Sequence, residues 1–254
     1  MTIDRAGDRN ALDSETLAQL GAHLEDAEGR GVRAIVYEGA GDEYFVGGAD
    51  GVEMHRFTPQ EARDFSRRIH ALFRRMEASP ILLVAAIDGL CFGGGLEFAL
   101  ACDVRIASAR SRAGLPEVKL GIIPGGGGTQ RLPRVIGMGR ATEMILTGRL
   151  LGADEALDAG LVHRVVPVEG LRAEAEAWVA RALRIPVHAF AAAKQATKVT
   201  YELPLERGLK VETERFAGCF ENCFFADCVR EQLANGRLET TRQDERKGSV
   251  DGDG

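Results

Sequence analysis

Residues 92–102, which read FGGGLEFALAC, contain the pattern on which the fold depends. Three glycines separate a continuous apolar run, Ile81 to Ile87, from a second apolar run, Leu96 to Cys102. The first run predicts a strand that is covered on both faces, and the second predicts a helix that begins after a flexible turn. A strand, a turn and a helix in so short a stretch predict a layered α/β core.

The same order of strand, loop and helix recurs on both sides of this stretch. Val32 to Tyr37 reads as a strand, and the loop from Gly39 to Gly51 has too many glycines for a helix and is too irregular for a strand. Thr58 to Glu61 then forms a capping box at the start of an amphipathic helix. Val104 to Ala107 reads as another strand, and the glycine cluster Gly125 to Gly128 precedes another helix. This alternation predicts the α/β class.

The pattern changes beyond residue 150. Val162 to Val166 reads as a last short strand, and nearly all of Glu169 to Gly236 reads as helix. The final stretch is charged and lacks an apolar period, which is typical of disorder. We therefore expect an α/β core over residues 1–168, a helical region over residues 169–238 and a disordered tail over residues 239–254.

The composition is that of an ordinary globular enzyme and excludes several partners. The chain has 254 residues, of which 45% are hydrophobic and 28% charged, so it is long enough to bury a full core. Its net charge of -6 repels phosphate backbones, so nucleic acid is not expected as a partner. The longest apolar stretch is far shorter than the ~20 residues of a membrane-spanning helix. Because the first ten residues contain no apolar signal segment, a cytoplasmic protein is expected.

The cysteines and the glycine clusters do not form familiar metal or nucleotide motifs. The five cysteines include no CxxC pair, so neither a metal site nor a disulfide framework is expected. Cys219 and Cys223 stand one helical turn apart and are expected to be small core residues. No GxxxxGK[ST] phosphate loop occurs, and no dinucleotide fingerprint follows a strand.

Two glutamates are the best candidates for acid–base chemistry. The chain has no GxSxG serine and no histidine pair with zinc-protease spacing, and its five histidines are isolated. Glu97 follows three glycines in an otherwise apolar segment, a setting that a surface ion pair would not need. Glu117 lies between Leu115-Pro116 and Val118, close to a second glycine-rich turn. Each glutamate alone could be an ordinary solvated or capping residue, but together with the glycines they indicate a catalytic site.

These residues belong to four segments that occur in a recognisable order: Arg9-Asn10-Ala11-Leu12, Gly47-Gly48-Ala49-Asp50, Phe92 to Glu97, and residues 114–125, which read GLPEVKLGIIPG. The continuation over residues 126–133, GGGTQRLP, completes the last segment. The set resembles the crotonase, or enoyl-CoA hydratase/isomerase, superfamily. The resemblance extends from about Thr2 to Val166.

The resemblance implies a fold and an assembly. It implies a spiral of ββα units, followed by a helical C-terminal region that forms trimers, which often pair into hexamers. It also implies an acyl-CoA thioester as substrate, so that coenzyme A is part of the substrate and no separate cofactor is needed. Only Met1 to Arg9 precede the Asn10-Ala11-Leu12 part of the first motif, so the first strand is expected to be missing or shortened.

The resemblance also implies the roles of individual residues. The N–H groups of Ala49 and Gly94 would bind the thioester oxygen as an oxyanion hole. Glu97 would accept the proton of the attacking water, Glu117 would deliver a proton to the α-carbon, and the Gly125 N–H would help to position the water. Further substrate contacts are implied for Ala11, Gly47, Asp50, Gly93 and Pro116.

Because both glutamates are present, we expect an enoyl-CoA hydratase, a hydro-lyase that adds water across the 2,3 double bond of a 2-enoyl-CoA. Another reaction of the superfamily is an alternative, such as isomerisation, dehydration of a hydroxyacyl-CoA or hydration of a methylglutaconyl-type thioester. A non-catalytic acyl-CoA binder is a further alternative.

Overall fold

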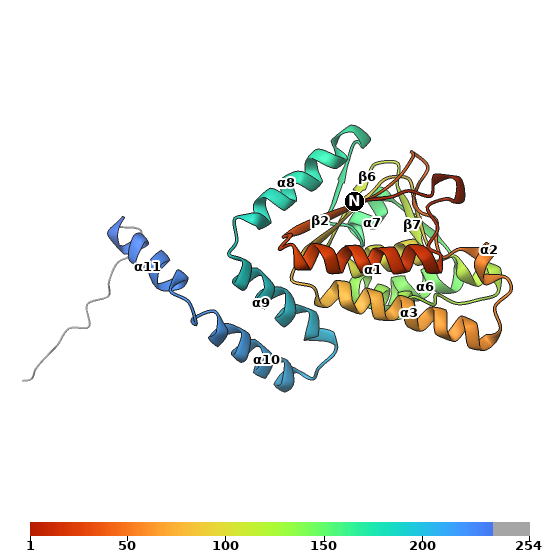
Figure 1. Cartoon of the computed structure of the whole chain (residues 1–254). Coiled ribbons are helices and arrows are strands. Elements are labelled where there is room, and N and C mark those ends of the chain that lie inside the picture. The colour runs from red at the N-terminus through yellow and green to blue at the C-terminus, as the bar shows by residue number, and fades with distance from the viewer. Residues whose placement is uncertain (236–254) are drawn as a thin grey trace, which may run out of the picture.

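The computed structural model describes residues 1–235, which form two β-sheets surrounded by helices (Figure 1). The larger sheet is parallel and has the order β1-β2-β4-β6-β9. Its strands are β1 (Thr2–Ile3), β2 (Ala34–Gly39), β4 (Leu82–Ile87), β6 (Val104–Ser108) and β9 (Arg164–Val166). The smaller sheet has the order β3-β5-β7-β8. Its strands are β3 (Tyr44–Val46), β5 (Leu90–Phe92), β7 (Arg112–Gly114) and β8 (Leu150–Gly152).

The chain builds both sheets at once, by a regular alternation. It adds β2 to the larger sheet and β3 to the smaller one before α3 (Pro59–Ala78), and then adds β4 and β5 in the same way before α4 (Gly94–Ala101). The strands β6 and β7 repeat this step, and a helical segment again follows. The α/β prediction is therefore confirmed, and each turn of the spiral is a ββα unit.

Local sequence signals set the bounds of the helices that cover the sheets. Asp13 caps α1 (Ser14–Gly29) by accepting a hydrogen bond from the Thr16 N–H, and Thr58 and Glu61 form the expected capping box of α3. The remaining elements of this part are η1 (Ala6–Asp8), α2 (Gly51–Met54), η2 (Glu117–Leu120), α5 (Gly128–Ile136), α6 (Met138–Thr147) and α7 (Ala153–Asp158).

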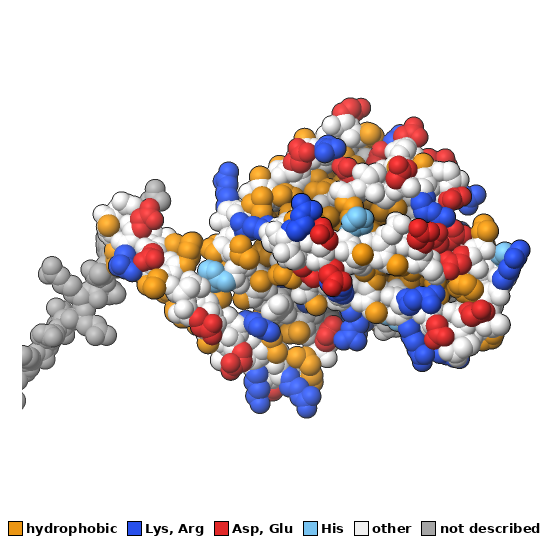
Figure 2. Space-filling view, in the orientation of Figure 1, with side chains coloured by type: hydrophobic (Ala, Val, Ile, Leu, Met, Phe, Trp, Pro, Cys, Tyr) orange, Lys and Arg blue, Asp and Glu red, His pale blue; other side chains and the backbone are white. Residues whose placement is uncertain are grey.

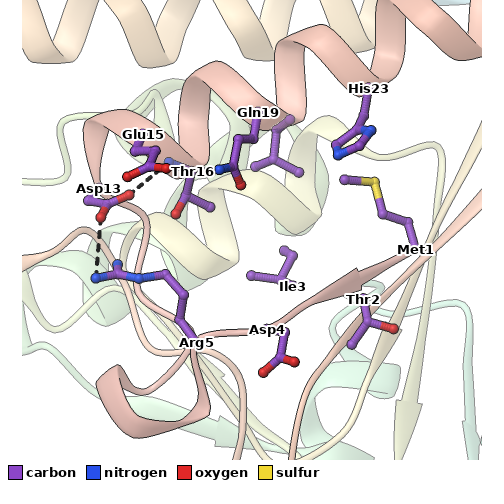
Figure 3. A pocket seen from close by; sticks show the side chains of 11 residues that line it. Met1, Thr2, Ile3, Asp4, Arg5, Asp13, Glu15, Thr16, Gln19 and His23 are labelled. Atoms are coloured by element: carbon purple, nitrogen blue, oxygen red, sulfur yellow. Dashed lines mark hydrogen bonds and ion pairs between the residues drawn. The ribbon is translucent and has the colours of Figure 1, made fainter.

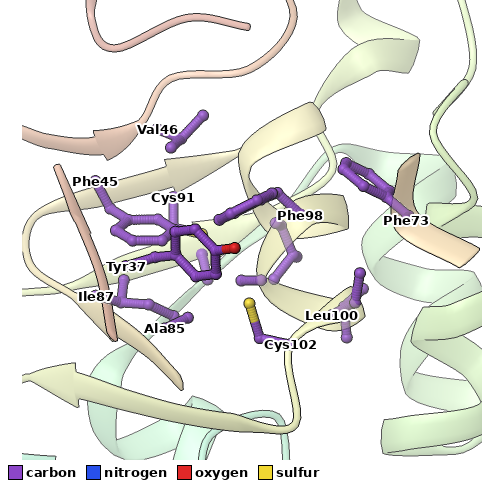
Figure 4. Close-up of a cluster of buried hydrophobic side chains, with 14 of the residues drawn as sticks. Tyr37, Phe45, Val46, Phe73, Ala85, Ile87, Cys91, Phe98, Leu100 and Cys102 are labelled. Carbon is purple, nitrogen blue, oxygen red and sulfur yellow. The ribbon is translucent and has the colours of Figure 1, made fainter. Parts of the chain in front are cut away.

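The main core forms around α4, all of whose residues are buried. The ring of Phe98 lies 5.0 Å from the ring centroid of Tyr37, and the rings of Phe73 and Phe45 also pack against it (Figure 4). The thiols of Cys91 and Cys102 are buried in the same cluster. Because α4 is enclosed on all sides, its one charged residue, Glu97, is buried with it.

Helices alone follow β9. They are η3 (Val168–Gly170), α8 (Leu171–Leu183), α9 (Val187–Lys198), η4 (Val199–Tyr201), α10 (Leu205–Gly218) and α11 (Phe224–Ala234). The buried residues Leu171 and Ala175 place α8 on the outer face of β4 and β6. In contrast, α10, α11 and the turn between them extend away from the sheets, and we call residues 205–234 the C-terminal arm (Figure 1).

A buried ion pair anchors α9 to the core. The Lys194 ammonium lies 2.7 Å from Asp103 Oδ2 and donates a second hydrogen bond of 2.7 Å to the Ile81 carbonyl. The same Asp103 oxygen accepts the Leu83 N–H. Burial lowers the pKa of Lys194, and the charge of Asp103 opposes that shift.

Three expectations need correction or comment. The loop from Gly39 to Gly51 contains β3, because pairing with β5 stabilises three residues whose pattern alone is too short to indicate a strand. Cys223 is exposed and Cys219 only half-buried, because the C-terminal arm does not pack on the sheets. The first strand is indeed short, since β1 has two residues. The predicted tail, residues 239–254, and the end of the predicted helical region lie outside the described residues.

We predict that Lys194→Met strongly destabilises the protein. The substitution leaves the buried Asp103 carboxylate without its main counter-ion, which typically costs about 3 kcal/mol. Urea denaturation at pH 7 measures the loss, and Lys198→Met is the matched control. Lys198 lies farther from Asp103, at 3.4 Å, and is 32% exposed, so its removal should cost less than about 1 kcal/mol. Equal losses in the two variants would contradict this account.

Candidate active site

The candidate site forms where three parallel strands of the smaller sheet end. The strands β3, β5 and β7 run in the same direction, so the segments that follow them meet at one edge of the sheet. These segments begin with Gly47, Gly93 and Leu115. The order of the strands therefore brings together three motifs that are far apart in the sequence.

Glu97 is the buried carboxylate of the site. Its side chain projects from the first turn of α4, and the residue is only 2% exposed. Its Oε1 accepts hydrogen bonds from the N–H groups of Gly126, at 2.8 Å, and Gly128, at 2.7 Å. Burial raises the pKa of Glu97, while these two bonds and the positive charge of Arg131 oppose the shift. The two N–H groups thus replace part of the hydration that the carboxylate loses.

Glu117 lies at the start of η2 and has a different environment. Its Oε2 is buried and has no hydrogen-bond partner among residues 1–235. Burial, with a smaller contribution from the charge of Glu97, raises the pKa of Glu117 from 4.5 to about 7. A buried carboxyl oxygen without a partner indicates a place where a ligand or a water binds. Near neutral pH this carboxyl is protonated in a large fraction of the molecules, and it can then donate a proton.

Two backbone N–H groups lie close together beside these carboxylates. A Cβ atom on Gly94 would lie 2.9 Å from the Ala49 nitrogen, so the first turn of α4 closely approaches the segment after β3. The bridge between Leu12 and Ala49 uses the Gly48 carbonyl and the Asp50 N–H, and so does not use the Ala49 N–H. The Gly94 N–H, at the first position of a helix, has no intrahelical acceptor. This pair is suited to bind one oxygen that develops negative charge.

Glycine is required at the turn between β5 and α4. Gly93 has a φ of 51°, which side chains rarely adopt, and a Cβ atom there would lie 3.1 Å from Glu117 Oε1. The same turn therefore brings the Gly94 N–H and the Glu117 carboxyl to one place.

Backbone hydrogen bonds to residues 9–12 support the segment that contains Ala49. The Gly47 N–H donates to the Arg9 carbonyl at 2.8 Å, and the Asp50 N–H donates to the Leu12 carbonyl at 2.9 Å. The Asp50 carboxylate caps α2 and also pairs with Arg5, which in turn pairs with Asp13 (Figure 3). Its side chain is thus occupied with structural contacts.

The structure brings most of the predicted residues together. The segments described above, which hydrogen bonds and close approaches connect, contain eight of them: Ala11, Gly47, Ala49, Asp50, Gly93, Gly94, Glu97 and Glu117. Pro116 directly precedes Glu117 at the start of η2, and its carbonyl accepts a hydrogen bond from the Lys119 N–H at 3.0 Å. Gly125 is exposed and adjoins Gly126, and its carbonyl accepts the Ser66 hydroxyl at 2.6 Å.

The local sequence pattern does not identify the residues that hold Glu97. It indicates Gly126 and Gly128 only as part of a cluster before a helix, although their N–H groups bind the carboxylate. The available signal was the run of four glycines itself, since close approach of a side chain to backbone is a common reason for glycine.

Other features of the described residues do not extend the site. A hollow of about 300 Å³ opens between β1 and α1 and is lined by Asp4, Glu15 and His23 among others, but by none of the predicted site residues (Figure 3). Within residues 1–235, no three side chains of His, Cys, Asp or Glu are grouped so as to hold a metal ion. None of the helices in this range has the length and apolar character that a membrane crossing requires.

Comparisons with known proteins agree on one family. A family profile described as "Enoyl-CoA hydratase/isomerase" matches residues 1–228. The chain is 40% identical over 240 residues to the short-chain-enoyl-CoA hydratase of Clostridium acetobutylicum, which covers 94% of this chain and 92% of that protein. It is 37% identical over 223 residues to the crotonyl-CoA hydratase of Syntrophomonas wolfei, covering 86% of this chain and 84% of the other. A crystal structure of enoyl-CoA hydratase from Bacillus anthracis superimposes with a TM-score of 0.86 at 35% identity, covering 93% of this chain and 91% of that one.

We predict that Gly126→Ala destabilises the protein by about 2 kcal/mol, because the added methyl group would overlap the Glu97 carboxylate and lie 2.9 Å from Ile69 Cγ2. Gly125→Ala is the matched control, since a Cβ atom there meets nothing within 4 Å, and it should change stability by less than about 0.5 kcal/mol. Urea denaturation measures both. In a Glu97→Ala background the cost of Gly126→Ala should fall, and an undiminished cost would refute the proposed overlap.

A second prediction concerns the dependence of stability on pH. Because folding raises the pKa of Glu117, its contribution to stability is fully present below pH 4.5 and is lost as the pH rises through 7. Since the carboxyl is partly open to solvent, we expect a loss of about 1–2 kcal/mol. Denaturation at pH 5 and pH 8 should show that wild type loses more stability over this interval than Glu117→Gln does. The same loss in both proteins would argue against the raised pKa.

Proposed function

The chain belongs to the enoyl-CoA hydratase/isomerase family, and from this premise we propose that it is an enoyl-CoA hydratase. The reaction adds water across the 2,3 double bond of a 2-enoyl-CoA thioester and gives a 3-hydroxyacyl-CoA. The names of the relatives from C. acetobutylicum and S. wolfei support a short acyl chain.

One observation carries the proposal: two carboxyl groups in different environments, one buried and one half-buried, lie beside the backbone N–H groups of Ala49 and Gly94. The carboxylate of Glu97 is held by two hydrogen bonds, whereas the carboxyl of Glu117 has a buried oxygen without a partner. Hydration needs one group to take a proton and one to give a proton, together with a site for the developing negative charge. These three elements are present within one site.

The first step is the addition of water. A water molecule between the glutamates loses one proton to Glu97, and its oxygen forms a bond to C3 of the substrate as the π electrons move toward the thioester. Negative charge develops on the thioester oxygen, where the N–H groups of Ala49 and Gly94 stabilise it. Each such donor typically contributes about 3 kcal/mol to the transition state.

The second step restores the thioester carbonyl. Glu117 transfers its proton to C2, the negative charge leaves the thioester oxygen, and the product is the 3-hydroxyacyl thioester. The raised pKa of Glu117 suits this role, because its protonated form is well populated near neutral pH. A new water molecule can then restore both glutamates to their starting states, because Glu97 gives up to it the proton that it gained and Glu117 takes a proton from it.

We assign the remaining substrate contacts by their positions in the family motifs. The substrate would bind along Ala11, Gly47, Ala49, Asp50, Gly93, Gly94, Pro116 and Gly125. For Asp50 the contact would come from the backbone, because its side chain caps α2 and pairs with Arg5. The Gly125 N–H would help to orient the water.

We also propose a homotrimer, or a dimer of trimers, assembled through the C-terminal arm. Apolar side chains gather on this arm (Figure 2), and Phe216, Phe220 and Phe225 are 66%, 51% and 53% exposed. Large aromatic surfaces of this kind are typical of an interface. The cytoplasmic location and the lack of a separate cofactor stay predictions from the sequence.

We predict that Glu97→Gln and Glu117→Gln each lower the rate of hydration by about 100-fold or more, because each removes a group that transfers a proton in the reaction. The loss of ultraviolet absorbance of crotonyl-CoA measures the rate, and the formation of 3-hydroxybutyryl-CoA identifies the product. Glu15→Gln, on the exposed face of α1, is the control and should keep the wild-type rate.

Measurements of thioester binding distinguish the proposed mechanism from the alternatives. Both variants should bind the saturated thioester butyryl-CoA as wild type does, because the oxyanion hole is unchanged. Near wild-type rates in both variants would overturn the mechanism. If wild type consumes only 3-enoyl or branched thioesters, the reaction is another one of the family, and if it binds thioesters without consuming any, the protein is a non-catalytic binder.

A further inference from the structure

Arg131 contacts the loop that holds Glu97, although it lies outside the hydrogen bonds of the carboxylate itself. Its guanidinium extends from α5, and Nη1 donates a hydrogen bond of 3.0 Å to the carbonyl of Gly126. The N–H of the same glycine donates to Glu97 Oε1. Gly126 is therefore held at both ends, by Arg131 at its carbonyl and by Glu97 at its nitrogen.

Glu77 fixes the guanidinium in turn. Its Oε1 and Oε2 accept hydrogen bonds from Arg131 Nε, at 2.7 Å, and Nη2, at 2.8 Å. The guanidinium also packs over the ring of Phe73, 5.8 Å from its centroid. The side chains of Arg131 and Glu77 are only 16% and 21% exposed, so this bidentate pair is well shielded from solvent.

We infer that Arg131 and Glu77 are a positioning pair that keeps the Gly126–Gly128 loop, and through it the Glu97 carboxylate, in the geometry that water activation needs. The inference rests on the proposed function, in which Glu97 accepts the proton of water. The pair touches neither the substrate nor the reacting atoms, and it acts through the peptide groups of the loop. Its positive member also lies close enough to favour the ionised form of Glu97.

Charged and titratable groups from three described elements lie near Glu97. Arg131 comes from α5, Glu77 and His70 come from α3, and Glu117 comes from η2. Of these, Arg131 is the cation that opposes the effect of burial on the pKa of Glu97. Removing its charge should therefore make Glu97 hold its proton to a higher pH.

The first test is the pH profile of kcat for crotonyl-CoA hydration in a matched set of variants. In Arg131→Met the acidic limb should move upward by about half a pH unit or more, and kcat at its optimum should fall about 10-fold. KM should stay within about 3-fold of wild type. Arg131→Lys keeps the charge but not the two-pronged contact, so its acidic limb should stay near the wild-type position while kcat still falls.

Two further variants distinguish an effect of the Arg131 charge on the acidic limb from a general loss of structure around Glu97. Glu77→Gln removes a negative charge near Glu97, so the acidic limb should not move upward. His70→Gln removes a titratable group of α3 that faces the same loop at Gly127, and it should leave the limb in place. An acidic limb that is the same in Arg131→Met and wild type would overturn the inference, because a merely structural role lowers stability and kcat without moving the limb.

A second measurement needs no substrate, and it separates failure of this inference from failure of the proposed function. The loss of urea midpoint caused by Arg131→Met should be larger in wild type than in a Glu97→Gln background at pH 7. Unequal losses support the coupling of Arg131 to Glu97 even if the protein hydrates no thioester. Equal losses in both backgrounds would overturn the inference while leaving any measured hydratase activity intact.

Discussion

The buried carboxylate of Glu97 is the constraint on which the rest of the site depends. A carboxylate loses much of its hydration when α4 is enclosed by the core, and this cost must be offset by hydrogen bonds or by protonation. The two N–H groups of Gly126 and Gly128 supply hydrogen bonds to one oxygen of the group. Glycine is needed there because a Cβ atom on Gly126 would overlap the Glu97 carboxylate, and one on Gly128 would lie 2.7 Å from Leu115 Cδ1 and 3.0 Å from Glu97 Oε1. Glu97 and the glycine-rich loop are thus a single structural unit.

The alternation of strands between two sheets explains why the other parts of the site converge. Each ββα unit places one short strand in the smaller sheet, and the segments after β3, β5 and β7 leave at the same edge. The N–H groups of Ala49 and Gly94 come from the first two of these segments, and Glu117 comes from the third. Meanwhile Phe98, the residue after Glu97, fixes α4 in the aromatic core. Packing on one side of α4 therefore positions the chemistry on the other.

The sequence predicts the long, strongly patterned elements well and the short ones poorly. The capping box of α3 and the apolar run of β4 each carry a local signal, and both elements lie where that signal places them. The strand β3 has only three residues and is stabilised by its neighbour, so its own residues give no period to detect. The bonds from Gly126 and Gly128 to Glu97 join residues about thirty positions apart, which a local pattern cannot show. The candidate glutamates could be selected because carboxylates next to glycine-rich apolar turns are unusual, whereas the raised pKa of each follows from burial and required the structure.

The distribution of the cysteines gives the chain a built-in reporter of its own assembly. Cys91 and Cys102 are enclosed in the aromatic core, and burial raises the pKa of Cys102 to about 12, so these thiols do not react readily with alkylating reagents. Cys219, Cys223 and Cys228 all lie on the C-terminal arm, where Cys223 is exposed. A maleimide dye therefore labels the arm and leaves the two cysteines of the aromatic core unmodified. The speed of labelling then reports how much of the arm another surface covers, without any engineered attachment point.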